Sequence, residues 1–378
     1  MIAYLAGWTR KKDSIFAAIA DAAGGGVRLP FIGLSFRPFP ESARRARAAL
    51  AVAKRQPKGG LGRALKFGLI WAQYNWSRRY FTRHKDRVAV CWNGLTGSRR
   101  AFMEGARDAG AARLFVELAP FPDRVTIDPS GVNGQNSLPR EPAFYLNWMA
   151  QDPARQGAAW RALGANLTAR ASRRADVGQG DGSALEGAGR FLFCPLQVPN
   201  DSQITLFAGW VGSVERMLGA LATAAAALPE GWHIRVKEHP SARSSLAEPL
   251  AAAVARAGGR IVVDNQTDTF AQVAASDGVI TINSSVGLQA FFHDKPVITL
   301  GEAFFAIPGL VTPVGDAAEL SRVLAAPEAL SFDPALRGAV MTYLDHVYYP
   351  KTQPDGAGGV TVDAIAIRRK LREAGAGE

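Results

Sequence analysis

The chain has 378 residues, of which 48% are hydrophobic and 20% charged, a composition typical of a globular protein with room for two domains. It contains no apolar run of about 18 residues, and residues 1–13 lack the pattern of a signal peptide, so we expect a cytoplasmic protein. Cys91 and Cys194 have no metal-ligand spacing, which predicts two buried, reduced thiols.

The net charge of +11 is concentrated in one region. Residues 27–100 hold seventeen Arg or Lys against Glu41 and Asp86, so the rest of the chain is mildly acidic. Such a region favours a polyanionic partner: nucleic acid, an anionic lipid surface or an acidic substrate. The sequence contains no recognisable RNA- or DNA-binding module, which disfavours nucleic acid.

In chain order, the first half predicts a strand at 2–6, a helix after residue 13, an extended segment at 27–36 and a basic helical region over 40–85. Within this region apolar residues recur three or four positions apart: Leu61, Leu65, Leu69, Ala72 and Trp76. The pattern fits an amphipathic helix at a membrane surface, or equally a helix whose apolar face packs on its own domain.

A strand–helix–strand unit is predicted over 87–118, followed by a long loop to residue 140 and two helical patches at 141–151 and 155–170. The glycine-rich segment 172–190 has the composition of a linker. It predicts a boundary between a domain of residues 1–180 and one of residues 181–378, with the last helices packing back on the first domain.

The second half alternates apolar strands with helices, with strands expected at 190–196, 233–240, 260–264, 278–283 and 296–300. This alternation predicts a doubly wound parallel sheet. The fold class is therefore α/β, with two Rossmann-like domains facing a central cleft.

Open parallel sheets bind ligands beyond the carboxyl ends of their strands. The polar residues at these positions in the second half are Gln197, Asp201, Gln203, Lys237, Glu238, His239, Asn283, Ser284 and Ser285. Ser284, Ser285 and Gly287 open a predicted helix, where backbone N–H groups favour a phosphate, although a serine there can simply cap the helix. Lys237 and His239, leaving another strand, would add a cation and an imidazole to the same place.

The sequence lacks the motifs that would indicate other classes of ligand. The sequence has no P-loop and no glycine fingerprint for a dinucleotide, and no His or Cys cluster suggests a metal. His233 and His293 have no functional context and are expected to be structural.

The motifs QVPNDSQI, KEHP, INSSVGLQAF and KPVITLGEAFFAIPGL occur in this order, after WNG and VELAPFPDRVTIDPSGVN in the first half. Together they resemble the capsule polysaccharide biosynthesis family, in particular bacterial β-Kdo transferases of the Kps type. The resemblance covers residues 88–312.

This resemblance implies a retaining glycosyltransferase of the two-domain GT-B architecture that uses CMP-β-Kdo and needs neither a metal nor another cofactor. It implies that His239, Ser284 or Ser285 contacts the CMP phosphate, with Lys237 nearby. The remaining motif residues are then expected around the phosphate (Asn283, Gly287), the nucleotide or sugar (Gln197, Asp201, Gln203, Glu238) and the cleft (Trp92, Asn93, Gly94, Asn133, Arg140).

The resemblance also assigns Asp128 as nucleophile and Glu117 as general acid or base, with the roles open to exchange. The alternative from the residues alone is that Asp128 caps the turn before Pro129 and Glu117 pairs with an arginine.

The chain's single-module length resembles members that place the first Kdo on a phosphatidylglycerol-type lipid. The basic segment 28–100 is then expected to hold the protein on the inner face of the cytoplasmic membrane, with other capsule-assembly proteins as further partners. Two alternatives stay open: a sialyltransferase-like enzyme that uses another CMP-linked nonulosonate, and a non-catalytic, membrane-associated capsule-assembly adaptor.

Overall fold

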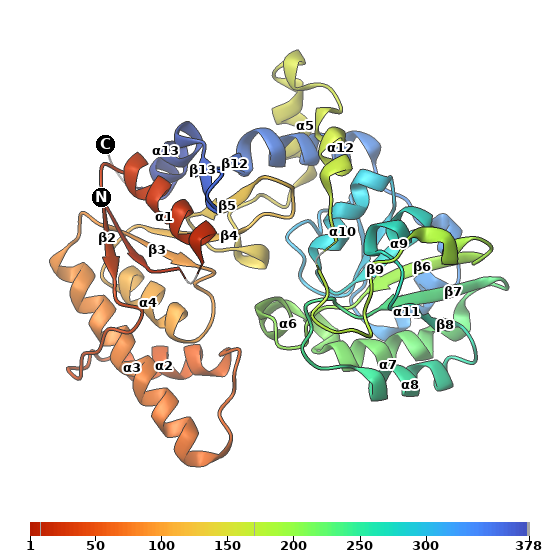
Figure 1. Cartoon of the computed structure of the whole chain (residues 1–378), viewed down its shortest axis with the longest axis horizontal. Coiled ribbons are helices and arrows are strands. Elements are labelled where there is room, and N and C mark those ends of the chain that lie inside the picture. The colour runs from red at the N-terminus through yellow and green to blue at the C-terminus, as the bar shows by residue number, and fades with distance from the viewer. Residues whose placement is uncertain (8, 170, 376–378) are drawn as a thin grey trace. The chain divides into compact units, whose positions relative to one another are not determined.

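The computed structural model describes residues 1–7, 9–169 and 171–375 (Figure 1). The chain forms two compact units. Unit 1 consists of Met1–Ala119, Asp123–Leu138 and Leu344–Glu378, and unit 2 of Pro120–Pro122 and Pro139–Tyr343. Each unit is built on its own mainly parallel sheet, so the α/β prediction with two Rossmann-like sheets is confirmed.

The sheet of unit 1 has the strand order β2-β1-β3-β4-β5, and all its pairs are parallel except β4 with β5. Its strands are β1 (Ile2–Leu5), β2 (Gly26–Leu29), β3 (Val88–Trp92), β4 (Arg113–Leu118) and β5 (Val125–Asp128). Every residue of the central strand β3 is buried, as expected of an apolar strand covered on both faces.

Helices cover both faces of this sheet (Figure 1). One face packs against α1 (Arg10–Ala22) and α13 (Ala364–Glu373), which share a core with β3 and β4. The other face carries α2 (Ser42–Ala51), α3 (Gly59–Arg83) and α4 (Gly97–Asp108).

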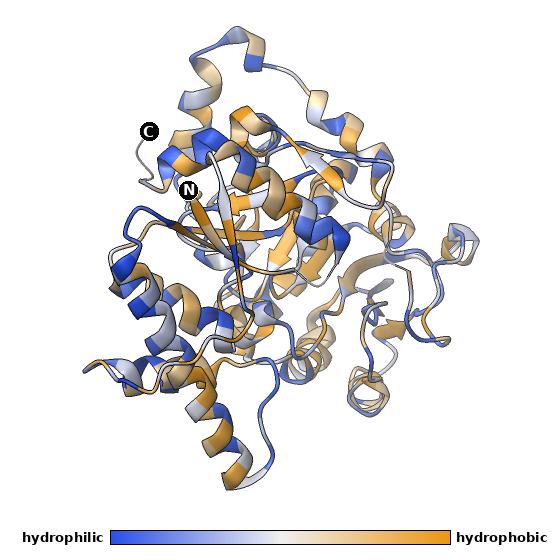
Figure 2. Ribbon diagram, turned by 60° about the vertical axis from the view of Figure 1, so that its left-hand side comes forward, coloured by the Kyte–Doolittle hydropathy of each residue, from blue (hydrophilic) through white to orange (hydrophobic). Residues whose placement is uncertain are grey.

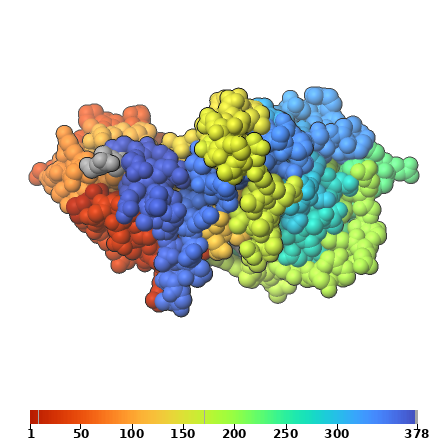
Figure 3. Space-filling model, turned by 90° about the horizontal axis from the view of Figure 1, so that it is seen from above, coloured from red at the N-terminus to blue at the C-terminus, as the bar shows by residue number. Residues whose placement is uncertain are grey.

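The C-terminal segment of the chain belongs to unit 1, as the sequence predicted for the last helices. A π-helix (Leu344–Tyr348), the hairpin β12 (Thr352–Pro354) and β13 (Val360–Val362), and α13 form this segment. Figure 3 shows the blue C-terminal segment lying against the red N-terminal one. Arg124 pairs with Asp345 at 2.9 Å and anchors the segment beside β5.

The sheet of unit 2 has the order β11-β10-β9-β6-β7-β8, and every pair is parallel. Its strands are β6 (Arg190–Pro195), β7 (Trp232–Lys237), β8 (Ile261–Val263), β9 (Gly278–Thr281), β10 (Val297–Thr299) and β11 (Thr312–Pro313). Its helices are α5 (Pro142–Ala150), α6 (Ser202–Phe207), α7 (Val214–Ala224), α8 (Ala247–Arg256), α9 (Thr269–Ala275), α10 (Ser285–Gln289), α11 (Ala317–Leu324) and α12 (Pro334–Tyr343). Leu218 and Leu221 of α7 pack with Ile234 and Ile280 in the core of this unit.

The predicted domain boundary at residue 180 differs from the structure, in which unit 2 already begins at Pro139. The glycine-rich segment 172–190 is not a free linker. The backbone N–H groups of Gly178 and Gly180 donate to the carbonyls of Asn265 and Gln266, each at 2.7 Å, so the segment is bound to the loop after β8. Its composition indicated flexibility, but these backbone hydrogen bonds hold it in place.

The basic helical region consists of two separate helices, and the longer one, α3, has two different halves. Leu61 and Leu65 in its first half are 77% and 66% exposed. Ala72 in the second half is buried, and Trp76 stacks on Phe102 with ring centroids 6.3 Å apart. Figure 2 shows hydrophobic colour on the part of α3 that projects from unit 1. The second half of α3 thus packs on its own domain, as one alternative expected, whereas the apolar side chains of the first half are exposed.

Two simpler expectations concern the membrane and the cysteines. None of the helices in the described part of the chain is long and apolar enough to span a bilayer. Cys91 and Cys194 are free and buried, as predicted, and burial raises the pKa of each thiol to about 12.

Candidate functional site

The carboxyl edge of the unit 2 sheet has its switch point between β6 and β9, because β7 and β8 lie on one side of β6 and β9 to β11 on the other. Ligands of open α/β sheets bind at such points. Gln197 and Asn283 follow these two strands and meet there. The Gln197 Nε2 donates to Asn283 Oδ1 at 2.8 Å, and the Asn283 backbone N–H donates to Gln197 Oε1 at 3.2 Å.

These two amides serve the fold more than a ligand. Asn283 Nδ2 donates to the carbonyls of Gln203 at 3.1 Å and Phe207 at 2.8 Å, which ties the end of β9 to α6. Asn283 is only 3% exposed and Gln197 only 8%. The predicted contacts of Gln197 with the nucleotide and of Asn283 with its phosphate are therefore replaced by contacts between strand ends.

The two serines differ in what they can offer a ligand. Ser284 Oγ accepts from the Val286 N–H at 3.2 Å, and Ser284 N–H donates to Thr281 Oγ1 at 3.0 Å, so this serine caps α10 as the alternative expected. Ser285 is exposed, and the structure shows no hydrogen bond of its hydroxyl to any described residue. Of the two serines, Ser285 is therefore the one that solvent can reach.

Gly287 has a packing role. A Cβ at this position would lie 2.9 Å from the Phe305 ring and 3.0 Å from the Thr281 methyl, so only glycine fits. Gly287 is buried, and a direct phosphate contact is not its function in this structure.

Lys237, predicted beside the phosphate, faces the protein interior. It is 1% exposed, and its Nζ donates to the carbonyls of Gly178, Asn265 and Thr267 at 2.8, 2.9 and 2.7 Å. All three ammonium hydrogens are used, and burial lowers the pKa of this lysine. Lys237 holds the loop after β8 in place through these hydrogen bonds, and its assignment as a phosphate ligand is corrected.

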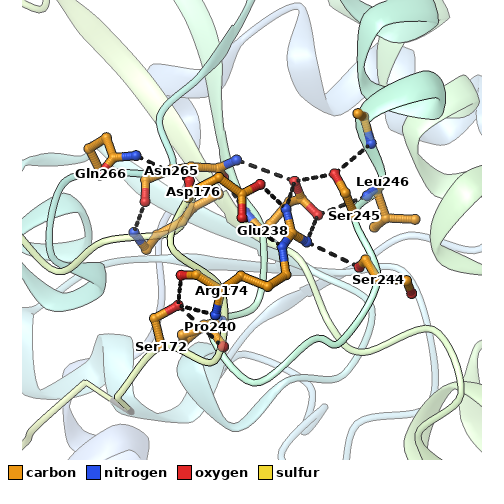
Figure 4. A network of polar contacts seen from close by, with 12 residues as sticks. Ser172, Arg174, Asp176, Glu238, Pro240, Ser244, Ser245, Leu246, Asn265 and Gln266 are labelled. Atoms are coloured by element: carbon orange, nitrogen blue, oxygen red, sulfur yellow. Dashed lines mark hydrogen bonds and ion pairs between the residues drawn. The ribbon is translucent and has the colours of Figure 1, made fainter.

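Glu238, predicted near the nucleotide or sugar, lies in the polar network of Figure 4 and is 2% exposed. Arg174 donates to both carboxylate oxygens at 2.7 and 3.1 Å, and the Leu246 N–H donates at 2.8 Å. Burial alone would raise the pKa of Glu238, but Arg174 and these hydrogen bonds lower it below its usual value. The network fixes the predicted linker to β7, so Glu238 is also corrected to a structural role.

His239 is the residue of the KEHP motif whose side chain is only half-buried. Its Nδ1 accepts from the Ser241 N–H at 3.0 Å. The neutral ring therefore carries its proton on Nε2, which makes that nitrogen a hydrogen-bond donor. Such a donor suits an anionic oxygen.

Asp201 and Gln203 lie at the start of α6. Asp201 Oδ1 accepts from the Gln203 N–H at 3.0 Å and so caps the helix. Gln203 is half-buried, and its carbonyl already receives the Asn283 amide.

The unit 1 sheet has its own switch point, between β1 and β3. Trp92 ends β3, and Asn93 and Gly94 form the turn that follows, with φ angles of 61° and 76°. A Cβ on Gly94 would lie 2.6 Å from the Phe115 ring, so the turn requires glycine.

Glu117 and Asn93 come together at this edge. Asn93 Nδ2 donates to Glu117 Oε2 at 3.1 Å, and the Leu118 N–H donates to Oε1 at 3.1 Å. Glu117 is half-buried near the end of β4, so a carboxylate is held in place while it stays accessible. Lys12 of α1 lies at the same edge, with its Nζ 4.3 Å from the centre of the Trp92 ring. The sequence reasoning missed Lys12, although TRKKD begins only four residues after the end of β1.

Asp128, predicted to be the nucleophile, is fully buried. Oδ1 accepts from the N–H groups of Ser130 and Gly131, and Oδ2 from Tyr348 Oη and from the N–H and hydroxyl of Ser137, all at 2.7–3.0 Å. Five donors saturate this carboxylate, so it organises the loop after β5. The turn-capping alternative describes Asp128, and the nucleophile assignment is corrected.

The other two predicted cleft residues belong to different units. Asn133, with a φ of 58°, opens a short 3-10 turn of unit 1 (Asn133–Gln135). Arg140 belongs to unit 2 and is half-buried beside Glu141, whose carboxylate accepts the Arg140 backbone N–H at 3.1 Å. Within the described part of the chain, no group of three or more His, Cys, Asp or Glu is arranged to hold a metal ion.

Comparison with known proteins shows the family. A model of the capsule polysaccharide biosynthesis protein family matches residues 160–349, about half of the chain. The chain is also 31% identical to the protein FixF of Sinorhizobium fredii over 308 residues, 76% of this chain and 71% of that protein. The chain belongs to the capsule polysaccharide biosynthesis protein family.

Other comparisons find shorter or weaker similarities. Over 125 residues the chain is 28% identical to the capsule polysaccharide export protein KpsS of Escherichia coli, 32% of each chain. Among solved structures, the β-Kdo 2,7 transferase KpsC of Thermosulfurimonas dismutans has a TM-score of 0.47 at 15% identity, over 79% of this chain and 89% of that one.

Proposed function

We propose that this family member is a retaining glycosyltransferase of the GT-B architecture that transfers Kdo from CMP-β-Kdo to a phosphatidylglycerol-type lipid and so starts a capsule linker. The main support is the chemistry that each sheet edge offers by itself. Unit 2 presents the Ser285 hydroxyl and the His239 imidazole, whereas unit 1 presents the Glu117 carboxylate held by Asn93.

The unit 2 groups fit the leaving group of a CMP-linked sugar. When the bond between the anomeric carbon and the phosphate oxygen breaks, CMP leaves with the electron pair and its phosphate gains negative charge. Nε2–H of His239 and Oγ–H of Ser285 are neutral donors that stabilise such charge. Helix α10 has only five residues, so its dipole adds little and these two side chains carry the interaction.

Glu117 is the proposed reacting carboxylate, because Asp128 is fully buried and its oxygens accept hydrogen bonds from its own loop and from Tyr348. One Glu117 oxygen attacks the anomeric carbon as CMP leaves, and the acceptor hydroxyl then displaces it while its proton passes to the phosphate of the bound CMP. Two displacements preserve the donor's configuration. Asn93 fixes the orientation of the carboxylate throughout.

The first half of α3 and the loop before α2 are proposed to rest on the inner face of the cytoplasmic membrane. Five exposed apolar side chains gather in these segments: Ile32, Leu34, Phe36, Leu61 and Leu65. Positively charged residues accompany them in the sequence, among them Lys58 and Arg63, which are both exposed. Apolar side chains ringed by cations favour an anionic lipid interface.

The test is to incubate the purified protein with CMP-Kdo, generated in place, and short-chain lyso-phosphatidylglycerol, and to follow product mass. The proposal predicts a gain of one Kdo, with turnover lost in Glu117→Gln at unchanged thermal stability. Transfer from CMP-sialic acid but not from CMP-Kdo would overturn the donor assignment. The absence of transfer from any CMP-sugar, with membrane binding intact, would instead identify an adaptor.

A further inference from the structure

The switch point of unit 1 carries an unusual excess of positive charge. Two helices begin at this edge, α1 after β1 and α4 after β3, on opposite faces of the sheet (Figure 1). Helix N-termini are themselves partly positive, and their first turns usually favour acidic residues. The first turn of α1 instead holds Arg10, Lys11 and Lys12 beside one acid, Asp13, and that of α4 holds Arg99 and Arg100 with no acid.

Two carboxylates, Asp13 and Glu117, lie near these five cations and offset only part of their charge. Asp13 Oδ1 already accepts the Gly7 N–H at 3.0 Å, which closes the turn after β1. Glu117 is held by Asn93. Cations placed on the positive ends of two helices lower stability unless an anion joins them, and such local conflicts tend to occur at functional sites.

Contacts place two of these cations, Lys12 and Arg99, at the same edge, together with the loop that carries a third, Lys54. Lys12 is held over the Trp92 ring at the end of β3. Arg99 lies over the Phe31 ring at 5.6 Å. The loop that carries Lys54 packs on the start of α4, because a Cβ on Gly97 would lie 3.7 Å from Ala53 Cβ.

The electrostatics of Lys12 agree with this placement. Burial lowers the pKa of Lys12, Glu117 opposes that shift, and Arg99 and Lys54 lower the pKa further. The ammonium group therefore lies near one carboxylate, Glu117, and two further cations, and a bound anion would offset the repulsion among the three cations. Thr96 precedes α4, and its side chain forms no capping hydrogen bond with the backbone N–H groups of the first turn.

We propose that Lys12, Lys54 and Arg99 form a binding site for the phosphate group of the acceptor at the β1/β3 switch point. The site rests on the proposed function and deepens it, because a phosphate held here leaves the neighbouring acceptor hydroxyl beside Glu117. The phosphate belongs to a lipid headgroup or to a soluble phosphate ester, which share the chemistry that Lys and Arg recognise.

The test begins with binding in the absence of donor, measured by titration calorimetry with sn-glycerol 3-phosphate and, as the uncharged counterpart, glycerol. Lys12→Met is expected to weaken binding of glycerol phosphate about tenfold or more, the loss typical of a charge-assisted contact. The matched control is Lys11→Met, which removes the same charge from an exposed neighbour and should change binding less than about twofold. Thermal unfolding checks that both variants are folded.

Equal losses in both variants, or equal binding of glycerol and glycerol phosphate, would overturn the site. Comparing the wild-type affinities for short-chain lyso-phosphatidylglycerol and sn-glycerol 3-phosphate tells the lipid source from the soluble one, since a lipid site should bind the former more tightly. If glycerol phosphate binding depends on Lys12 but no CMP-sugar is turned over, the site stands and the transferase function fails. If transfer proceeds with equal KM for phosphorylated and neutral acceptors, the function stands and the site fails.

Discussion

The carboxyl edges of the two sheets look alike in sequence but use their charged residues in opposite ways. In unit 2, Lys237 and Glu238 turn inward and are saturated by carbonyls and by Arg174. In unit 1, Lys12 and Glu117 stay half-buried at the strand ends. A charged residue after a parallel strand therefore indicates a site only where the fold has not already satisfied it.

The largest expected effect comes from the saturated carboxylate Asp128. Asp128→Asn places an amide opposite donors such as the Ser137 N–H and Tyr348 Oη, and we expect the free energy of unfolding to fall by about 3 kcal/mol or more. Glu117→Gln is the control and should change stability by less than about 1 kcal/mol. Chemical denaturation measures both, and similar stabilities of the two variants would break the comparison.

Lys237→Met comes next. The change leaves the buried carbonyls of Gly178, Asn265 and Thr267 without their donor, at an expected cost of about 2–4 kcal/mol. CMP affinity, measured in the folded variant, should stay within about twofold of the wild type, because no phosphate contact is lost. A stable variant that binds CMP tenfold more weakly would instead indicate that Lys237 is a phosphate ligand.

Acid should weaken the same inward-facing region of unit 2. Burial alone would raise the pKa of Asp264, but hydrogen bonds from Thr267, Arg235 and Gln266 lower it to about 2. A depressed folded pKa stabilises the protein above the unfolded value of about 3.9, and that contribution is lost as the pH falls toward 2. In Asp264→Asn the stability should depend less on pH in this window, as unfolding titrations can measure. An unchanged slope would contradict the assignment.

The smallest effect on stability is expected in the exposed half of α3. A Leu61→Ser/Leu65→Ser double variant should change the free energy of unfolding by no more than about 0.5 kcal/mol, because both side chains already face solvent. Its binding to vesicles that contain anionic lipid should weaken about tenfold. Ile70→Ser, in the buried half, is the contrasting control and should destabilise the fold instead. Vesicle sedimentation that shows unchanged binding of the double variant would exclude this surface.

Much of the fold was predictable because hydrophobic periodicity and strand-end position are local properties. The strand–helix alternation of the second half and the buried thiols followed from them. The direction of each polar side chain did not, because it depends on partners distant in sequence: Lys237 binds carbonyls near residues 178 and 265, and Asp128 binds Tyr348. The boundary at residue 180 failed for the same reason, since glycine content does not reveal that Arg174 meets Glu238.

The central claim is that Glu117 reacts while Asp128 only holds its loop. The most direct measurement is mass spectrometry of the intact protein and of the products after one turnover with CMP-Kdo and lyso-phosphatidylglycerol, in wild type and in Glu117→Gln. The account predicts one Kdo on the wild-type lipid product and none from the variant, although the variant still binds CMP. Full turnover by Glu117→Gln, or a sugar adduct on Asp128, would contradict it.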